Sequence, residues 1–261
     1  MKIIKDYKNI QKVLLALIMF QSIACHAEEI MVLTSGIMKG SFAQIVPEFE
    51  KQTGHKIKSS WGPSAGKSPE ASQNRIRSGE YVDVLLMVNT SMDQLVKEGV
   101  FTPIDRRDVA VSKIGVAVKK GNPTPDISTP DALRNTLLSA KSVGFSEGAS
   151  GTYIENVLFQ KLGIATQMAP KSVVILGRKF VSEALVDNEV ALGMQQVSEL
   201  RLDDGITLIG PLPNELQKYS TISAAVSAKS TKQMAAKQFV NFLSTPFAKQ
   251  AIEKSGNDLP K

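Results

Sequence analysis

The stretch VGFSEGASGTY occupies residues 143–153 and joins an apolar start to a polar, glycine-rich continuation. A short apolar run that is followed by small and hydroxylated residues, and then by the helix-like residues 153–162, is typical of a strand that ends where a helix begins. In open parallel sheets, ligands lie beyond the carboxyl ends of the strands. This stretch therefore predicts both a strand–helix unit and a candidate binding junction.

The same alternation of strand-like and helix-like segments runs along the chain in two series. The first series has strand-like residues 30–34, 57–61 and 82–88 and helix-like residues 42–51, 69–78 and 92–98. The second has strand-like residues 142–145, 173–176, 190–194 and 206–209 and helix-like residues 130–140, 153–162 and 181–188. Such alternation predicts parallel sheets with helices on both faces, and two series predict two lobes.

Two further strand-like segments, residues 112–119 and 222–228, are predicted to cross between the lobes, and helix-like residues 231–244 and 246–254 to pack back on the first lobe. The predicted fold class is α/β, with two lobes that each hold a mostly parallel sheet, joined by two crossover strands. We expect a signal peptide at 1–27, lobe 1 at 28–111 and 229–261, and lobe 2, with the crossover strands, at 112–228.

The N-terminal segment has the features of a cleavable signal peptide. Lysines at positions 2, 5, 8 and 12 precede the apolar residues 13–20 and a small-residue cleavage site at Ala27. Cleavage there would remove Cys25, the only cysteine, and leave a periplasmic protein without disulfides. The alternative is a lipoprotein anchored through Cys25, although Ser22 stands where a large apolar residue is expected. No later segment approaches the about 20 apolar residues of a membrane helix.

Composition argues against several functional classes. The formal net charge is +6, half of it from residues 2–12, and no basic run is interleaved with aromatics, so nucleic acid is not an expected partner. His55 is the only histidine after processing and is predicted to lie exposed in a surface turn, which leaves little for a catalytic triad or a histidine metal site. No metal and no cofactor are expected. Residues 62–68 are one residue short of a phosphate loop, and Pro63 removes an amide.

Four predicted strand ends are rich in hydroxyl groups, glycine or positive charge. Their polar residues are Thr34 and Ser35, then Ser64 and Lys67, then Ser146, Ser150, Gly151 and Thr152, and finally Arg178. Amide groups at a helix start, together with the positive end of the helix dipole, stabilise an anion. Each junction alone also suits an ordinary cap or turn. Four at equivalent strand ends, in both lobes, favour a shared anion site in the cleft.

On Ser35, Ser64 and residues 79–88, 149–153 and 188–193, the chain resembles the periplasmic molybdate-binding-like proteins of the type II binding fold. This resemblance implies a monomer that binds a small anion, with a possible ABC permease as partner. Arg178 stands near a position whose backbone amide serves molybdate in that family, and Gln196 replaces its ligand tyrosine. Because a guanidinium matches a carboxylate in two parallel bonds, these departures suggest a di- or tricarboxylate.

Residues 62–69, 148–153 and 193–196 are similar to a branch of that family that includes bacterial periplasmic aconitate isomerase. This resemblance implies a cofactor-free allylic proton shift between cis- and trans-aconitate, with Gln195 and Gln196 beside the junction residues as ligand groups. Tyr153, Lys67 and Glu147 are the candidate proton carriers, although spacing favours none and Tyr153 equally suits packing at its helix start. The alternative is a non-catalytic solute-binding component of an ABC transporter for an organic acid or a molybdate-like oxyanion.

Overall fold

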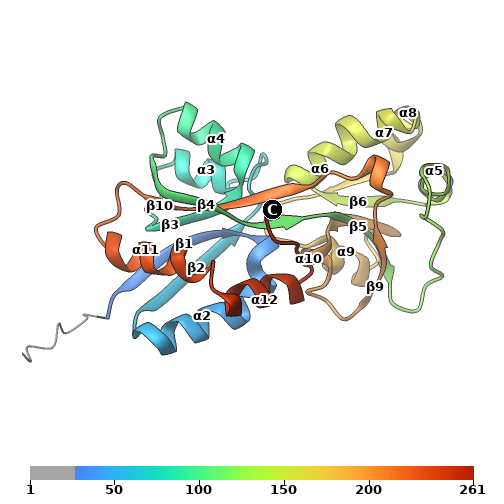
Figure 1. Ribbon diagram of the computed structural model, residues 1–261. Coiled ribbons are helices and arrows are strands. Elements are labelled where there is room, and N and C mark those ends of the chain that lie inside the picture. The colour runs from blue at the N-terminus through green and yellow to red at the C-terminus, as the bar shows by residue number, and fades with distance from the viewer. Residues whose placement is uncertain (1–26) are drawn as a thin grey trace, which may run out of the picture.

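The computed structural model describes residues 27–261, which fold into two lobes that lie side by side, each built on a five-stranded sheet (Figure 1). The predicted signal peptide and the lipoprotein alternative at Cys25 lie outside the described residues. Within residues 27–261, no helix combines the length and the apolar character that crossing a membrane requires.

The sheet of the first lobe has the strand order β2-β1-β3-β10-β4. Its strands are β1 (Glu29–Ser35), β2 (Lys56–Gly62), β3 (Val84–Val88), β4 (Pro103–Ser112) and β10 (Ser220–Ser227). One face is covered by α2 (Lys39–Thr53), α11 (Gln233–Phe242) and α12 (Pro246–Lys254), and the other by α3 (Ser72–Arg77) and α4 (Asn89–Lys97) (Figure 1). The last two helices of the chain therefore pack on the first lobe, as the sequence predicted.

The sheet of the second lobe has the order β7-β6-β8-β5-β9. Its strands are β5 (Ile114–Lys119), β6 (Val143–Ser146), β7 (Ser172–Ile175), β8 (Leu192–Gln196) and β9 (Ile206–Pro211). One face packs against α5 (Pro130–Ser139), α6 (Ala149–Tyr153), a π-helical turn (Ile154–Leu158), α7 (Phe159–Lys161) and α8 (Ala165–Met168). The other face packs against α9 (Val181–Val186) and α10 (Val197–Leu200).

Both sheets carry helices on both faces, and β3 shows how a central strand suits this arrangement. All five residues of β3 are buried. Val84 and Leu86 join the cluster under α2, α11 and α12, whereas Leu85 and Met87 join the cluster under α3 and α4. A strand covered on both faces reads as a continuous apolar run rather than as an alternating one. The apolar runs noted in the sequence therefore become the central strands.

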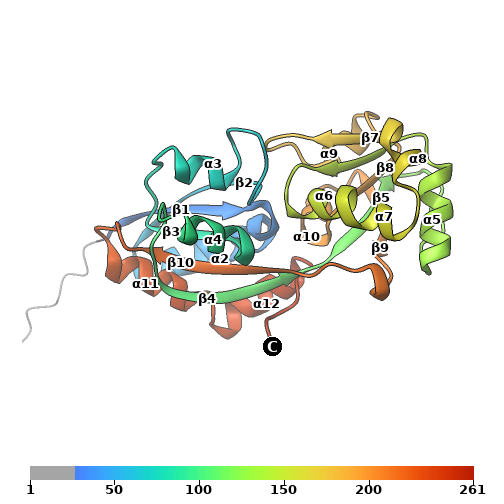
Figure 2. The same ribbon diagram turned by 90° about the horizontal axis from the view of Figure 1, so that it is seen from above.

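Each sheet contains one strand that runs against the other four, β5 at the predicted crossover segment 112–119 and β10 at the predicted segment 222–228. β10 lies wholly in the sheet of the first lobe, whereas the sequence placed it with lobe 2. β10 pairs antiparallel with β3 and β4, and β5 pairs antiparallel with β8 and β9. The chain passes between the lobes at Lys113, between β4 and β5, and again at residues 212–219, between β9 and β10 (Figure 2). The predicted two-lobed α/β fold with mostly parallel sheets is thus confirmed.

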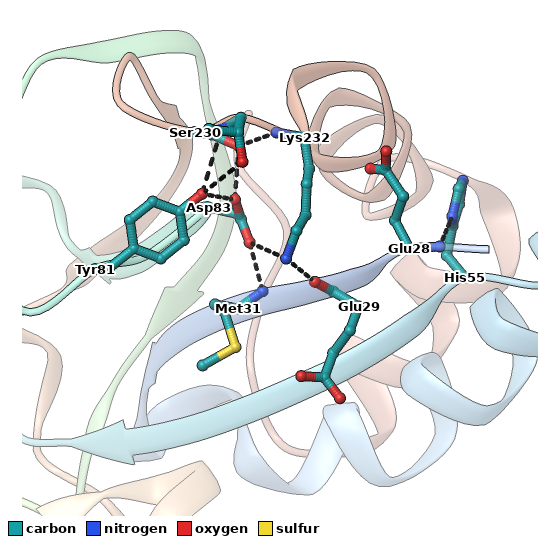
Figure 3. Close-up of polar contacts among 9 residues, drawn as sticks. Glu28, Glu29, Met31, His55, Tyr81, Asp83, Ser230 and Lys232 are labelled. Carbon is teal, nitrogen blue, oxygen red and sulfur yellow. Dashed lines mark hydrogen bonds and ion pairs between the residues drawn. The ribbon is translucent and has the colours of Figure 1, made fainter. Parts of the chain in front are cut away.

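The predicted exposure of His55 is wrong, because the turn after α2 folds onto the core of the first lobe. His55 is only 3% exposed. Its Nδ1 accepts the backbone N–H of Glu28 at 3.1 Å (Figure 3). Its ring stacks on Phe49 with a centroid distance of 6.2 Å. The histidine is therefore a packing residue that ties the start of β1 to the end of α2.

A second polar cluster ties the C-terminal segment to the first lobe. The fully buried carboxylate of Asp83 accepts the backbone N–H of Met31 at 2.8 Å and the hydroxyls of Tyr81 at 2.6 Å and Ser230 at 2.7 Å (Figure 3). The ammonium group of Lys232 lies 3.7 Å away. A buried carboxylate is tolerated when donors surround it in this way.

Candidate functional site between the lobes

The strand ends of both sheets meet at one cavity between the lobes. The first lobe contributes Ser35, Ile37, Trp61, Pro63, Ser64 and Val88, and the second contributes Ser146, Gly148, Ala149, Ser150, Gly177, Lys179, Phe180, Gln195, Gln196 and Glu199. The cavity is narrow, because the volume open to the centre of a water molecule is about 30 Å³. That is room for roughly two waters. A six-carbon acid would need the lobes to part at their two crossings.

Four serine hydroxyls of the cavity wall are held by the backbone or by each other. Ser35 Oγ accepts the N–H of Ile37 at 3.4 Å, and Ser64 Oγ accepts the N–H of Val88 at 3.0 Å. A hydroxyl oxygen that accepts an amide hydrogen keeps its own O–H group as a donor. Ser146 and Ser150 share a hydrogen bond of 3.3 Å, which uses one of their two hydroxyl hydrogens. The wall therefore offers several fixed donors to an anion.

Two glutamines at the end of β8 add buried amides to the same wall. The Oε1 atom of Gln195 accepts the N–H of Val181 at 2.9 Å, and Nε2 of Gln196 donates to Ser220 Oγ at 3.1 Å. Gln196 is 2% exposed, and its Oε1 has no hydrogen-bond partner within the described part of the chain. An unsatisfied buried polar atom is costly unless water or a ligand bonds to it. Gln196 thus keeps one polar atom for whatever occupies the cavity.

Glu147 connects the two lobes along one edge of the cavity. Its Oε2 accepts the N–H groups of Lys67 at 2.7 Å and Ser68 at 2.9 Å from the first lobe, and its Oε1 accepts the N–H of Gly177 at 2.9 Å. Burial alone would raise the pKa of Glu147, but these hydrogen bonds outweigh it and lower the pKa. Gly66, with φ of +149°, is required here because a Cβ would lie 2.6 Å from the carboxyl carbon.

A pair of aromatic rings also connects the lobes. Trp61 at the end of β2 stacks on Phe180, just before α9, with ring centroids 4.6 Å apart and planes tilted by only 4°. The ammonium group of Lys39 lies 4.6 Å from the Trp61 centroid and 5.0 Å from the Phe180 centroid. Such cation–π contacts hold a positive charge beside two rings of the cavity wall, and Lys39 forms no ion pair within residues 27–261.

Glu199 is the one acidic residue of the cavity wall in residues 27–261. It lies in α10, which begins directly after β8, and it is 8% exposed. Burial raises the pKa of Glu199 to about 8, and a hydrogen bond from Gln195 offsets only part of this. A Cβ on Gly36 would collide with Glu199 Oε1, so the glycine lets the two lobes approach. Glu199 was not predicted from the sequence, although an acid in the first turn after a strand end is a signal of the same kind as the polar strand ends.

Six of the predicted ligand residues line the cavity: Ser35, Ser64, Ser146, Ser150, Gln195 and Gln196. Three others lie behind the wall. The Thr34 hydroxyl is directed at the carbonyl oxygen of Ser35, at 3.4 Å, and that of Thr152 donates to Gly148 O at 3.1 Å. Gly151 lets α6 pack on β6, because a Cβ there would collide with the carbonyl of Ser146.

The predicted cations and proton carriers lie outside the cavity lining. Lys67 and Arg178 are exposed, and Lys179, which does line the cavity, directs its ammonium group to Asp187 at 2.8 Å and Glu189 at 2.7 Å. The hydroxyl of Tyr153 donates to the carbonyl of Leu216 at 2.8 Å, and its ring packs on the core of the second lobe. Glu147 is bound by the three amides described above. No group of three potential metal ligands from His, Cys, Asp and Glu occurs within residues 27–261.

The sequence and the fold were compared with those of known proteins. The family model described as "Bacterial extracellular solute-binding protein" matches residues 30–257. An aconitate isomerase from Pseudomonas sp. is 37% identical over 225 residues, which is 86% of each chain, and the molybdate-binding protein ModA of Azotobacter vinelandii is 24% identical over 90% of this chain and 92% of its own. The solved periplasmic molybdate-binding protein of Azotobacter vinelandii shares the fold, with a TM-score of 0.71 at 19% identity, over 89% of this chain and 100% of that one. The protein belongs to the family of bacterial extracellular solute-binding proteins.

Proposed function

We propose that this protein is a periplasmic aconitate isomerase that interconverts cis- and trans-aconitate in the cavity between its lobes. The observation that carries the proposal is its 37% identity with the Pseudomonas sp. aconitate isomerase over 86% of both chains. That likeness spans both lobes and both crossings between them. The substrate would be held as a small anion, without a cofactor.

The cavity wall supports the binding of several carboxylates. Ser35 and Ser64 of the first lobe, and the Ser146–Ser150 pair of the second, offer hydroxyl donors. Lys39 brings a positive charge to the rim. The exposed Lys67 and Arg178 are proposed to attract the substrate as the lobes close, since surface cations raise the rate of association with anions.

The chemistry required of such a site is a shift of one proton along a three-carbon unit. A proton leaves the methylene carbon, the double bond moves by one position, and a proton is added to the carbon at the other end. The negative charge that develops between these steps spreads onto a neighbouring carboxylate. Fixed hydroxyl and amide donors stabilise such charge in a site from which water is excluded.

A second candidate function is a solute-binding component of an ABC transporter for an organic acid or a molybdate-like oxyanion. Membership of the extracellular solute-binding family and the likeness to the molybdate-binding protein ModA favour it. The hydrogen bonds of Glu147 across the lobes would serve capture and closure equally well. A proton carrier at the cavity is required only by the isomerase.

The two functions are separated by incubating the purified protein with cis- or trans-aconitate in deuterated buffer and following both isomers by proton NMR. Interconversion, with or without deuterium incorporation, is the expected result. Thermal stabilisation by aconitate without turnover would support the transport function instead. Strong stabilisation by molybdate and none by either aconitate would contradict a tricarboxylate ligand altogether.

A further inference from the structure

Within residues 27–261, the cavity wall holds one carboxyl group, that of Glu199, and its hydrogen bond comes from the side chain of Gln195. Glu199 is buried and lines the cavity, and its side chain meets Gly36 of the opposite lobe. It therefore lies where the lobes close on each other. Glu147, by contrast, is occupied by three backbone amides, and Tyr153 by a carbonyl oxygen. A general acid or base must lie within hydrogen-bonding reach of the reacting atom, and Glu199 meets this geometric requirement better than either.

The other charged groups around α10 are directed elsewhere. Among the elements packed on α10, α2 contributes Lys39, which lies over two aromatic rings, and β5 contributes Lys119, which donates to the carbonyl of Val186 at 2.7 Å. Glu183 of α9 accepts the N–H of Phe180 at 2.6 Å. Arg201, two residues after Glu199, packs against Gly256. Glu199 thus has a largely uncharged environment, with Gln195 as its hydrogen-bond donor.

We infer that Glu199 is the catalytic proton carrier of the isomerase proposed above, an assignment that rests on that proposed function. The ionised carboxylate removes a proton from the methylene carbon of bound aconitate. The C–H electron pair enters the allylic system and shifts the double bond by one position. The same carboxyl group then returns the proton to the carbon at the far end, so that no oxidant, reductant or second substrate is consumed.

The surroundings of Glu199 suit this task. Burial raises the pKa of Glu199 to about 8, which makes its carboxylate a stronger base than an exposed one and still leaves it partly ionised near neutral pH. Gln195 can orient the carboxyl group because its own oxygen is held by the N–H of Val181 at 2.9 Å. Closure onto Gly36 then brings the carboxyl group against the lobe that carries Ser35 and Ser64.

The test is Glu199→Gln in the full protein, assayed by proton NMR in deuterated buffer with trans-aconitate. The variant should still be stabilised thermally by trans-aconitate, because a neutral carboxyl group and an amide have nearly the same shape. Its interconversion and its deuterium incorporation should both fall by at least about 100-fold, the usual contribution of a positioned acid–base group. In the unchanged protein, kcat/KM should rise with pH and level off above about 8. The exposed Glu155→Gln is the matched control and should retain full activity.

Two results would overturn this assignment. Near-normal turnover in Glu199→Gln would show that another group moves the proton, and loss of aconitate binding in that variant would make Glu199 a ligand-binding residue. Absence of turnover in the unchanged protein is a different result, since it would remove the proposed isomerase function itself and the assignment with it. If Glu199→Gln folds poorly, Glu199→Leu takes its place in the same assays, because leucine also lacks the acid. It should bind trans-aconitate and show the same loss of turnover.

Discussion

Two glutamates near the cavity between the lobes have opposite surroundings: Glu199 lines the cavity, whereas Glu147 lies outside its lining and joins the lobes. Glu147 is ionised and fixed, because three backbone amides from both lobes surround its carboxylate. Glu199 is buried among apolar and neutral groups, which raises its pKa to about 8. One carboxyl group is thus held by backbone amides of both lobes, whereas the other lies in the cavity wall with a hydrogen bond from a side chain. A residue type at a strand end therefore does not fix a role; the donors around it do.

The largest expected effect is that of Glu199→Gln on the free energy of unfolding at high pH. The raised pKa of Glu199 means that the folded protein holds a proton which the unfolded chain releases above about 4.5. Stability from this group is thus fully present below pH 4.5 and is lost as pH rises through about 8. Glu199→Gln removes that loss, so the variant should be more stable than the unchanged protein at pH 9, by about 1.4 kcal/mol for each unit of pKa shift.

Urea unfolding at pH 5, 7 and 9 measures this difference. The two proteins should be nearly equal at pH 5 and diverge progressively above it. Equal pH slopes for both proteins would mean that Glu199 is not held neutral by burial. Glu147 is the opposite case, because its pKa is lowered in the folded protein. Its contribution to the free energy of unfolding is fully present above pH 4.5 and is lost as the pH falls through the lowered pKa.

The second largest expected effect is that of Glu147→Gln on ligand affinity, because Glu147 joins the two lobes. Glu147→Gln cannot accept all the amide hydrogens that the carboxylate accepts, and charge-assisted hydrogen bonds are about twice as strong as neutral ones. Because this carboxylate is partly exposed, solvent screening reduces the loss. We expect ligand affinity to fall about 10-fold, or about 1.4 kcal/mol, as measured by isothermal titration calorimetry.

Gly66→Ala provides an independent change at the same edge. The φ of +149° at Gly66 is unfavourable for alanine, and the new Cβ would meet the Glu147 carboxyl group. This variant should weaken binding by a similar amount. Since both changes disrupt one set of contacts, the double variant should lose much less than the sum of the two single losses. Additive losses would show that Gly66 and Glu147 act separately.

The sequence predicted the fold well because its strongest signals are local. The apolar run of β3 and the reversed segments β5 and β10 are recognisable without knowledge of the rest of the chain. β4 was missed except for its last residue, because the charged residues Asp105, Arg106, Arg107 and Asp108 interrupt its alternation. In the same way, the four-residue α10 is too short to show helical periodicity, so Glu199 went unnoticed.

The candidate site was only partly predictable, because its decisive contacts join residues far apart in sequence. Polar strand ends identified the serines of the cavity wall. Nothing local could show that the amides of Lys67 and Ser68 bind Glu147, 80 and 79 residues away. For the same reason, Arg178 was predicted as a ligand residue and Lys179 was not, although of the two only Lys179 lines the cavity. Which donors remain for a ligand is decided by tertiary contacts.

The smallest expected effect concerns the stacked rings of Trp61 and Phe180. They are the second contact between the lobes, besides the hydrogen bonds of Glu147. Trp61 is the only tryptophan of the chain, and its ring stacks on Phe180 of the other lobe at 4.6 Å. Its fluorescence should therefore change when aconitate draws the lobes together. Phe180→Leu removes the stacking but keeps an apolar side chain, so binding should weaken by less than about 1.5 kcal/mol.

The fluorescence change also tests whether the Trp61–Phe180 contact and the Glu147 hydrogen bonds form in the same motion. If closure is one concerted motion, Glu147→Gln should shift the ligand concentration needed for the tryptophan signal, whereas Glu199→Gln should leave it nearly unchanged while turnover is lost. A tryptophan signal that is insensitive to Glu147→Gln would mean that these two contacts form independently. In that case the hydrogen bonds of Glu147 would hold the loop at residues 62–68 in place without controlling access to Glu199.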